Sequence, residues 1–475
     1  MLRQTSTYMF AHAISAVLGL CSVVVFTRLL SPAEYGFYII CMSFSGVVSA
    51  LLFGWIKISV LRFESEGEGT DIRLTALFGL LIAMTVSPIA VIIIVFVTGQ
   101  SLLTASVAVG LALTLGAYEF GLEVLRARQR TVAYGLSAVL RAVLAIVLSL
   151  LLVWSGLAGL GLVLGVAGAY LFTALLFTRV IWQPPVNKFN STVFQQMLKY
   201  GAPMATAGIV FSLHSAMDRL IIVHFLGEAA AGVYGASADL VRQIVLFPAT
   251  AVAAAVVPAA IKAFANEGSA AGKERMAASG ELLLGILAPT VVGLALVAPH
   301  IAAIVLGTEF RESASQLMPV LAFVWMFQVF TQQFVHVSFH IAKTPRLLAI
   351  QGCLVLVINV ALMLALVPLY GLIGAAWALL IAEAMGVAIG YVLASRAQPL
   401  PLLVRPFLKV FVATAAMAVS TYLVLSLSDS LAGFAATIAA GMITYAIAAL
   451  LLDIAGLRQA LSRQIHRVRP TPTRD

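Results

Sequence analysis

The chain has 475 residues, of which 62% are hydrophobic and only 10% are charged. Soluble domains carry about 25% charged residues, so a chain of this composition could not cover its own surface in water. The composition therefore excludes a soluble protein and predicts an all-α, polytopic membrane protein. The formal net charge of +9 is tested first as membrane topology, because cytoplasmic loops collect Lys and Arg.

Apolar windows of about 19–20 residues predict about 14 transmembrane helices. The first follows Arg3 and is predicted to stay uncleaved, because its apolar part is about 19 residues long. In chain order the predicted spans are 9–27, 36–56, 74–97, 101–121, 133–153, 158–180, 203–225, 232–256, 281–306, 317–340, 347–367, 371–394, 404–427 and 431–452.

The distribution of Lys and Arg predicts the orientation. With the N-terminus in the cytoplasm, Arg28 and Arg311 fall in outer gaps, and Arg141, Arg219 and Arg242 fall within spans. The remaining 23 of the 28 basic residues then lie in cytoplasmic gaps or tails. This asymmetry follows the positive-inside rule and predicts that both termini are cytoplasmic. It explains the basic balance without nucleic acid, so no nucleic-acid partner is expected.

Extramembrane segments are predicted to be short. The longest loop covers about 257–280, so no outer domain for catalysis is expected. Motifs for nucleotide binding, nucleophilic catalysis or zinc-dependent hydrolysis are absent from the sequence. The three cysteines lie in apolar segments without the spacing of a metal site or a disulfide framework. We therefore expect no enzyme activity, no metal and no cofactor.

Two pairs of similar stretches indicate an internal repeat. "LLSPAEYGFY" (29–38) matches "FLGEAAAGVY" (225–234), and "GLAGLGLVLG" (156–165) matches "GLIGAAWALL" (371–380). Both members of each pair occupy the same place in their half, which predicts two parallel six-helix lobes. The predicted parts are an N-lobe (1–182), a cytoplasmic interlobe linker (183–198), a C-lobe (199–396), two further helices (397–454) and a basic cytoplasmic tail (455–475).

Three stretches resemble one family. "FTRLLSPAEYGFYII" resembles the signature that opens Wzx-type polysaccharide transporters, within the multidrug/oligosaccharidyl-lipid/polysaccharide superfamily. "MDRLIIVHFLGEAAAGVYGAS" resembles its second-lobe counterpart, and "YGLIGAAWALL" resembles the opening of its twelfth helix. The resemblance implies a flippase in the bacterial inner membrane that moves undecaprenyl-diphosphate-linked oligosaccharides by alternating access of two lobes around a cationic cavity.

The resemblance also implies partners and alternatives. The cargo would serve O-antigen, capsule or exopolysaccharide assembly, with a polysaccharide polymerase and a chain-length regulator as partners besides the bilayer. Two other transport functions stay open: a cation-coupled multidrug-type exporter and a lipid II flippase. A membrane scaffold is the alternative outside transport, but it would not need charges deep within the spans.

Charges in spans seven and eight form the first candidate site. Asp218 with Arg219, and Asp239 with Arg242, lie at matching depths of about 10–15 Å from the outer surface. Adjacent helical residues point about 100° apart, so the expected pairs are Asp218 with Arg242, or Arg219 with Asp239. This cluster either only locks the two helices together or lends Arg219 or Arg242 to the cargo diphosphate.

Two more arginines are candidates for the cationic cavity. Arg141 lies about 12 Å into span five from the cytoplasmic side and either lines the cavity or pairs with Glu119 or Glu123. Arg28, at the outer end of span one, either pairs with Glu34 or contacts the cargo.

Glu383 lies near the middle of span twelve and is the candidate for ion coupling. A buried carboxylate there could carry H⁺ or bind Na⁺ during transport, or be a protonated packing residue. Lys57 and Arg62, at the inner end of span two, are expected to extend towards lipid headgroups. His336 and His340 share one helical face and are expected to make helix contacts rather than bind a metal.

Overall fold

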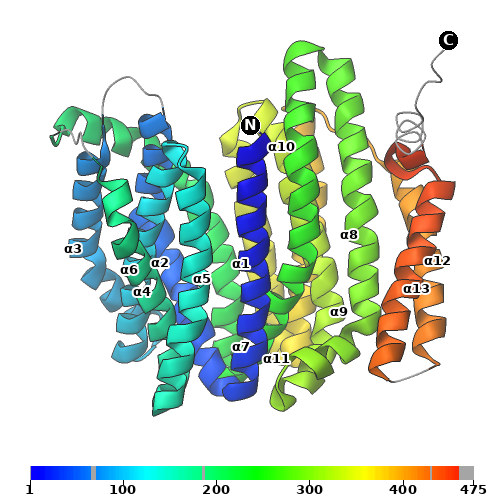
Figure 1. Cartoon of the computed structure of the whole chain (residues 1–475), viewed down its shortest axis with the longest axis horizontal. Helices are drawn as coiled ribbons and strands as arrows, with labels where there is room; N and C mark the ends of the chain where they lie inside the picture. Colours follow the sequence, from blue (N-terminus) through cyan, green and yellow to red (C-terminus); the bar gives the residue numbers. More distant parts are fainter. Residues whose placement is uncertain (1, 66–70, 184–187, 428–429, 459–475) are drawn as a thin grey trace, which may run out of the picture. The chain divides into compact units, whose positions relative to one another are not determined.

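The computed structural model describes residues 2–65, 71–183, 188–427 and 430–458, and this part contains helices and no strand. Ten continuous helical stretches are long and apolar enough to cross a membrane, which confirms a multi-span, all-α membrane protein (Figure 1). The helices are α1 (Leu2–Leu29), α2 (Pro32–Ser65), α3 (Arg73–Thr98), α4 (Leu102–Ala127), α5 (Thr131–Leu152), η1 (Val153–Leu157), α6 (Ala158–Ile181), α7 (Ser191–Asn266), α8 (Ser269–Val305), α9 (Thr308–Phe330), η2 (Thr331–Val335), α10 (His336–Ile341), α11 (Pro345–Ser395), α12 (Val404–Leu425), α13 (Leu431–Leu451) and η3 (Ile454–Gly456).

Glycines divide the longest helical stretches into two arms. Gly227 interrupts α7 with a φ of 85°, and Gly371 interrupts α11 with a φ of 61°. Gly156, with a φ of 92°, lies in η1 between α5 and α6. Residues with a side chain rarely adopt these positive φ angles. Gly156 and Gly371 are the first residues of the two matched stretches of the repeat, so both halves bend at the same place.

The prediction of a loop over about 257–280 is wrong, because most of this segment is helical. α7 continues to Asn266, and α8 begins at Ser269, so this region is a helical hairpin whose arms run side by side (Figure 1). Ala, Lys and Glu favour helix here although they end the apolar window. At the turn, Gly272 lies against the ring of Phe264, where a Cβ would meet ring carbons at 2.4 Å.

The chain divides into two compact units. The first unit contains Met1–Leu240, Val305–Ser313 and Leu348–Ala382, and the second contains the remaining segments. The predicted N-lobe falls within the first unit, whereas the lobe boundaries themselves stay a prediction. Residues 184–187 of the predicted linker and 459–475 of the predicted tail lie outside the described residues.

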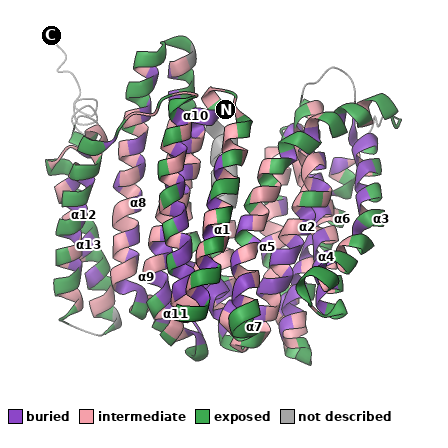
Figure 2. Ribbon diagram, turned by 180° about the vertical axis from the view of Figure 1, so that it is seen from behind, coloured by how far each residue is buried: buried purple, intermediate pink, exposed green. Residues whose placement is uncertain are grey.

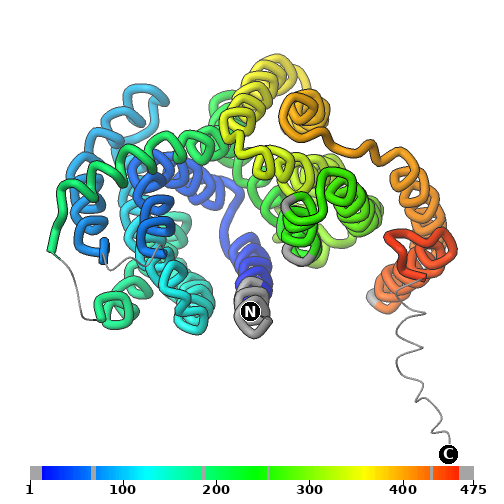
Figure 3. The backbone as a smooth tube through the Cα atoms, turned by 90° about the horizontal axis from the view of Figure 1, so that it is seen from above, coloured from blue at the N-terminus to red at the C-terminus, as the bar shows by residue number. Residues whose placement is uncertain are grey.

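Within the first unit, α2 packs against α4, and α5 packs against α6. Figure 3, which looks along the helices, shows these blue and cyan segments in adjacent positions. Phe53, Ile56 and Val60 of α2 lie in one apolar cluster with Val124 of α4. The ring of Phe53 lies over Gly116, because small residues let membrane helices approach closely.

The predicted interlobe linker is helical from Ser191. The Asn190 side chain caps α7 by accepting hydrogen bonds from the backbone N–H of Thr192 (2.9 Å) and of Val193 (3.2 Å). Ser59 of α2 then donates a hydrogen bond of 2.8 Å to the backbone oxygen of Met197. The start of α7 is therefore fixed on α2 instead of forming a free connection.

In the second unit, α12 and α13 pack against each other and are joined to α8 by two polar contacts. The Tyr445 hydroxyl donates a hydrogen bond to the backbone oxygen of Gly285, and Lys409 lies 3.6 Å from Glu281. Figure 2 shows many exposed positions on α12 and α13. Large apolar side chains such as Phe411 and Met442 are among the exposed residues. Exposed apolar faces on both helices are expected where a helix pair meets lipid.

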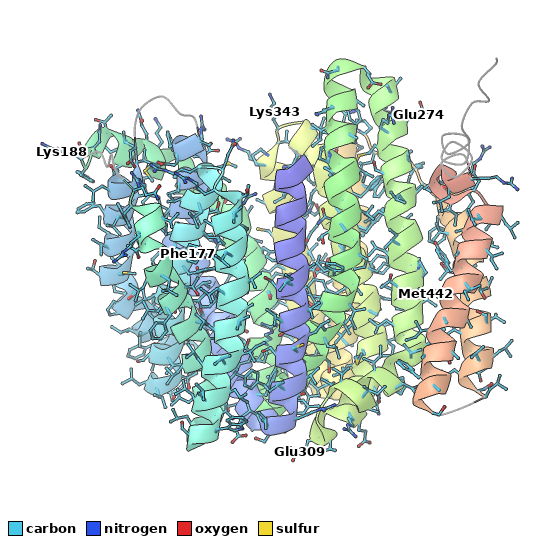
Figure 4. All side chains as sticks on the ribbon, viewed as in Figure 1. Phe177, Lys188, Glu274, Glu309, Lys343 and Met442 are labelled. Carbon is cyan, nitrogen blue, oxygen red and sulfur yellow. The ribbon has the colours of Figure 1, made fainter. Side chains whose placement is uncertain are left out.

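Labelled side chains mark the helix ends in each unit (Figure 4). In the first unit, Lys188 and Glu309 lie at opposite ends of the helices. In the second unit, Glu274 and Lys343 lie at the same end. Lys188 and Lys343 both belong to gaps predicted to face the cytoplasm, so each unit can be oriented by its own lysine.

Candidate functional site

The turn that carries the repeat motif is closed by a capping box. The Glu34 carboxylate accepts hydrogen bonds from the Ser31 backbone N–H (2.8 Å) and hydroxyl (2.9 Å), and the Ser31 oxygen lies 3.4 Å from the Glu34 N–H. The spacing Ser-x-x-Glu was readable in the sequence. Glu34 therefore has a structural role in starting α2. Arg28 is exposed at the last turn of α1, three residues before this cap.

The two copies of the repeated turn lie against each other. A Cβ on Gly36 would meet the backbone oxygen of Glu228 at 2.0 Å, and a Cβ on Gly232 would meet that of Pro32 at 2.0 Å. Because 36 matches 232 and 32 matches 228 at the repeat offset of 196, the contact is reciprocal. Ile39 likewise lies on Gly235, its counterpart. We call this contact between α2 and the second arm of α7 the glycine crossing.

Of the two ion pairs expected across spans seven and eight, the structure contains Arg219 with Asp239. Arg219 Nη2 lies 3.3 Å from Asp239 Oδ1, and Arg219 Nη1 lies 3.4 Å from the hydroxyl of Ser43 on α2. Both charged side chains are mostly buried. The pair thus joins the two arms of α7 and also reaches α2.

Asp218 points to a different partner that the sequence did not reveal. It accepts a hydrogen bond from the Asn359 side-chain amide of α11, and both residues are buried. The other amide atom, Asn359 Oδ1, has no hydrogen-bond partner among the described residues. A carboxylate beside an unused amide oxygen offers oxygen atoms to a small cation or to a proton.

Arg242 and Glu383 belong to the second unit. The Arg242 guanidinium carbon lies 5.7 Å from the centroid of the Trp325 ring, a cation–π contact. Glu383 is buried. The His336 ring lies 6.1 Å from the Phe339 ring of the same helix, and the expected contacts of His336 and His340 with other helices stay a prediction. Within the described ranges, no group of three or more His, Cys, Asp and Glu residues could hold a metal ion.

Arg141 lies on a tyrosine platform. Its guanidinium carbon is 5.6 Å from the centroid of the Tyr170 ring of α6, and the Tyr118 ring of α4 lies 5.4 Å from that of Tyr170. The two carboxylates considered as partners have other cations nearby, since Glu119 pairs with Lys57 and Glu123 with Arg126. Among the described residues, no carboxylate lies within 4 Å of Arg141.

The expectation that Lys57 extends to lipid headgroups is wrong. Lys57 Nζ lies 2.8 Å from Glu119 Oε2, and the Ser49 hydroxyl lies 3.4 Å from the same oxygen. Arg62, its neighbour on α2, lies 4.1 Å from the centroid of the Tyr200 ring. Position at the end of a span predicted a free lysine, but the packing of α4 on α2 supplies a carboxylate.

Tyr38 lies near two candidate arginines of the first unit, Arg141 and Arg219. Its hydroxyl interacts electrostatically with Arg141 of α5 and with Arg219 of α7, as well as with Asp239 and Tyr170. The Tyr35 ring packs 5.5 Å away on the same helix. Tyr38 belongs to the repeat motif, but the sequence alone indicated no role for it. Arg141, Arg219 and Tyr38 come from three helices of one unit, and this trio is the candidate site.

A separate charge network closes the other end of α2. Arg73 is fully buried, pairs with Asp71 and donates to the backbone oxygen of Ile181. Arg128 lies 2.6 Å from Glu64 and 3.5 Å from Asp71. Burial raises the pKa of Asp71, but the hydrogen bonds and charge of Arg73 outweigh it and hold that pKa below its ordinary value. The network joins the ends of α2, α3, α4 and α6.

The comparison with known proteins gives one family. The family model described as "Polysaccharide biosynthesis protein" matches residues 25–315 of the chain. That range includes the glycine crossing and the trio of Tyr38, Arg141 and Arg219. No curated protein matches the chain.

Solved structures show the fold. The lipid II flippase MurJ in an inward closed conformation is similar with a TM-score of 0.78 and 17% identity, covering 95% of this chain and 99% of that chain. An inward-facing multidrug resistance MATE transporter of the MOP superfamily is similar with a TM-score of 0.64 and 16% identity, covering 80% of this chain and 95% of that chain. A MOP superfamily transporter from Pyrococcus furiosus is similar with a TM-score of 0.58 and 15% identity, covering 83% of this chain and 95% of that chain. These neighbours are flippases and transporters, not enzymes.

Proposed function

Because this chain belongs to the polysaccharide biosynthesis protein family and has the fold of flippases and multidrug transporters, we propose that it is a flippase for undecaprenyl-diphosphate-linked oligosaccharides in the bacterial inner membrane. The cargo would be a unit of O-antigen, capsule or exopolysaccharide, moved from the cytoplasmic to the periplasmic leaflet. A polysaccharide polymerase and a chain-length regulator would act after it.

One observation carries the proposal about the cargo. Arg141 and Arg219, on two helices of one unit, are both close enough to Tyr38 for their charges to act on its hydroxyl. Arg141 has no carboxylate within 4 Å among the described residues, so its charge is available to an anion. Guanidinium groups bind phosphate oxygens in pairs, and a hydroxyl adds a further donor. The trio therefore suits a diphosphate better than an uncharged or cationic drug.

The proposed membrane arrangement has fourteen spans and cytoplasmic termini. The arms of α7 on either side of Gly227, and those of α11 on either side of Gly371, each count as two spans. Counting α5 and α6 separately, and α9 together with α10, then gives fourteen spans, an even number that agrees with the distribution of Lys and Arg. Accessibility of single cysteines to a membrane-impermeant reagent tests it, because Glu309 and Lys188 positions should react from opposite sides.

The cargo proposal is tested in the host. Deletion of the gene should abolish one surface polysaccharide and cause a lipid-diphosphate sugar to accumulate in the cytoplasmic leaflet. Arg141→Gln and Arg219→Gln should fail to complement at normal protein levels, whereas Arg179→Gln, an exposed residue on α6, should complement. Normal polysaccharide together with altered drug sensitivity in the deletion strain would contradict the proposal and favour a multidrug exporter.

Alternating access requires the glycine crossing to separate in one state. The γ-carbons of Ile39 lie 2.7 and 3.0 Å from the Cβ position of Gly235, so cysteines at 39 and 235 suit disulfide formation. With Cys21, Cys41 and Cys353 replaced by alanine, Ile39→Cys/Gly235→Cys should transport only when reduced. The control pair Gly121→Cys/Ile181→Cys lies within the predicted N-lobe and should transport when oxidised.

Ion coupling is proposed at two carboxylates. Glu383 in the second unit and Asp218 with Asn359 in the first unit are both buried, and either could take up H⁺ or Na⁺. Reconstituted transport driven in turn by a pH gradient and a Na⁺ gradient distinguishes the two ions. Glu383→Gln and Asp218→Asn then show which carboxylate is required.

A lipid II flippase is the second candidate. The solved flippase covers 95% of this chain, whereas the MATE transporter covers 80%. Rescue of a strain depleted of its own lipid II flippase would favour this cargo. Failure to rescue, together with restored surface polysaccharide in the deletion strain, would favour the oligosaccharide.

A further inference from the structure

The ion pair of Lys57 and Glu119 does not belong to the candidate site of Tyr38, Arg141 and Arg219, but Tyr170 lies near both Glu119 and Arg141. The two charged atoms are 2.8 Å apart, and the side chains keep 31% and 25% of their exposure. The buried Arg73 network shows how this unit builds a permanent lock, with an arginine at 0% exposure. A partly exposed lysine–carboxylate pair is easier to open than a fully buried one, since water can reach both charges.

A second carboxylate adds to this pair. Glu123 follows Glu119 by one helical turn on α4, so both carboxylates share one face. Glu123 interacts electrostatically with Lys57 and Glu119, and lies 3.7 Å from Arg126. Its Oε2 atom is buried and has no hydrogen-bond partner among the described residues. Two adjacent carboxylates, one with a buried unbonded oxygen, form a site that can take up a proton.

The charged and titratable groups around this pair come from α4 itself and from three of the helices that contact it, α2, α5 and α6. Lys57 projects from α2, Glu123 and Arg126 lie on α4 itself, and Tyr170 of α6 interacts electrostatically with both Glu119 and Arg141 of α5. Lys57 and Arg126 therefore balance the two carboxylates, and Arg141 lies nearby across Tyr170. Protonation of one carboxylate leaves these four groups with one net positive charge, beside the charge of Arg141.

We propose that Glu119 and Glu123 bind a proton, and that this protonation frees the Lys57 ammonium to bind the anionic group of the cargo. The proton passes from water to a carboxylate oxygen, and Lys57 stays charged throughout. The proposal rests on the proposed function, since the anion would be the cargo diphosphate held by Arg141. Deprotonation would restore the Lys57–Glu119 pair and expel the diphosphate, which couples proton movement to release.

Binding of a soluble prenyl diphosphate tests the proposal. Farnesyl diphosphate is titrated against the purified full chain in detergent from about pH 5 to about pH 8.5. Wild-type affinity should rise as pH falls, by up to about tenfold per pH unit for one linked proton. Glu119→Gln should bind as tightly as the wild type does at low pH and keep only the pH dependence of the probe's own phosphate. Lys57→Met should bind weakly throughout.

The matched control is the other Lys–Glu pair. Lys409 and Glu281 lie 3.6 Å apart in the second unit, and Glu281→Gln should keep the wild-type pH profile. A Glu119→Gln profile that follows the wild type would overturn the proposal. If that variant does not fold, an unchanged profile for Lys57→Met overturns it equally. Wild-type binding without pH dependence contradicts this inference alone, whereas absence of binding at every pH contradicts the diphosphate cargo itself.

Discussion

Substitution of Gly36 by alanine should force the glycine crossing apart. The added Cβ would lie 2.0 Å from the Glu228 backbone oxygen, whereas real Cβ contacts do not fall below 3.0 Å. The two backbones must therefore separate by at least 1.0 Å, the difference between these distances. Overpacking of this kind costs about 1–3 kcal/mol, and alanine returns up to about 1 kcal/mol of helix propensity. The net effect should be destabilising.

Gly46 on the same helix is the matched control, because a Cβ there meets nothing within 4 Å. Gly46→Ala should stabilise the protein by up to about 1 kcal/mol, since it gains helix propensity without a clash. Gly36→Ala combined with Gly232→Ala should cost less than the two single changes together, because both separate the same helices.

Thermal unfolding of the purified protein in detergent measures these differences. We expect the unfolding temperature to be highest for Gly46→Ala, lower for the wild type and lowest for the Gly36→Ala/Gly232→Ala double variant. The double variant should still unfold at a higher temperature than the summed losses of the two single variants would give. A Gly36→Ala protein as stable as Gly46→Ala would refute the close backbone contact. Strictly additive losses would show that the two glycines belong to different contacts.

Three further predictions concern charged residues of the first unit. Arg73→Gln should cost about 3 kcal/mol, because it removes a fully buried guanidinium and leaves Asp71 with Arg128 alone, at 3.5 Å. The exposed Arg126→Gln should change stability by less than about 1 kcal/mol in the same unfolding assay. Because the pKa of Asp71 is lowered in the folded protein, its contribution to stability is complete above its ordinary pKa of about 3.9. That contribution is lost as the pH falls through the pKa of the folded state. Asp71→Asn should therefore make the unfolding temperature less sensitive to acid. Arg141→Lys should keep its charge but lose the planar contact with Tyr170, and prenyl diphosphate should bind about tenfold more weakly, although still more tightly than to Arg141→Gln.

The helices could be predicted from sequence because a bilayer fixes the length of an apolar span. The helical hairpin around Gly268 could not, since its charged arms leave the apolar window while keeping helical propensity. The prediction of side-chain partners was incomplete for another reason. Depth along a helix gave the Arg219–Asp239 pair, but the Lys57–Glu119 pair depends on the rotation of α4 against α2, which no local pattern contains. Asn359 was missed because an amide in an apolar span carries no charge signal.

The glycine crossing has a consequence for the history of this chain. Each copy of the turn offers a glycine to the backbone oxygen four residues before the other copy's glycine, so the two copies use equivalent backbone positions for one reciprocal contact. A self-complementary patch of this kind is what a twofold-symmetric homodimer requires. A half-length ancestor with a single copy of the turn would meet a second copy of itself through the same atoms. Gene duplication would then have turned a subunit interface into a contact within one polypeptide.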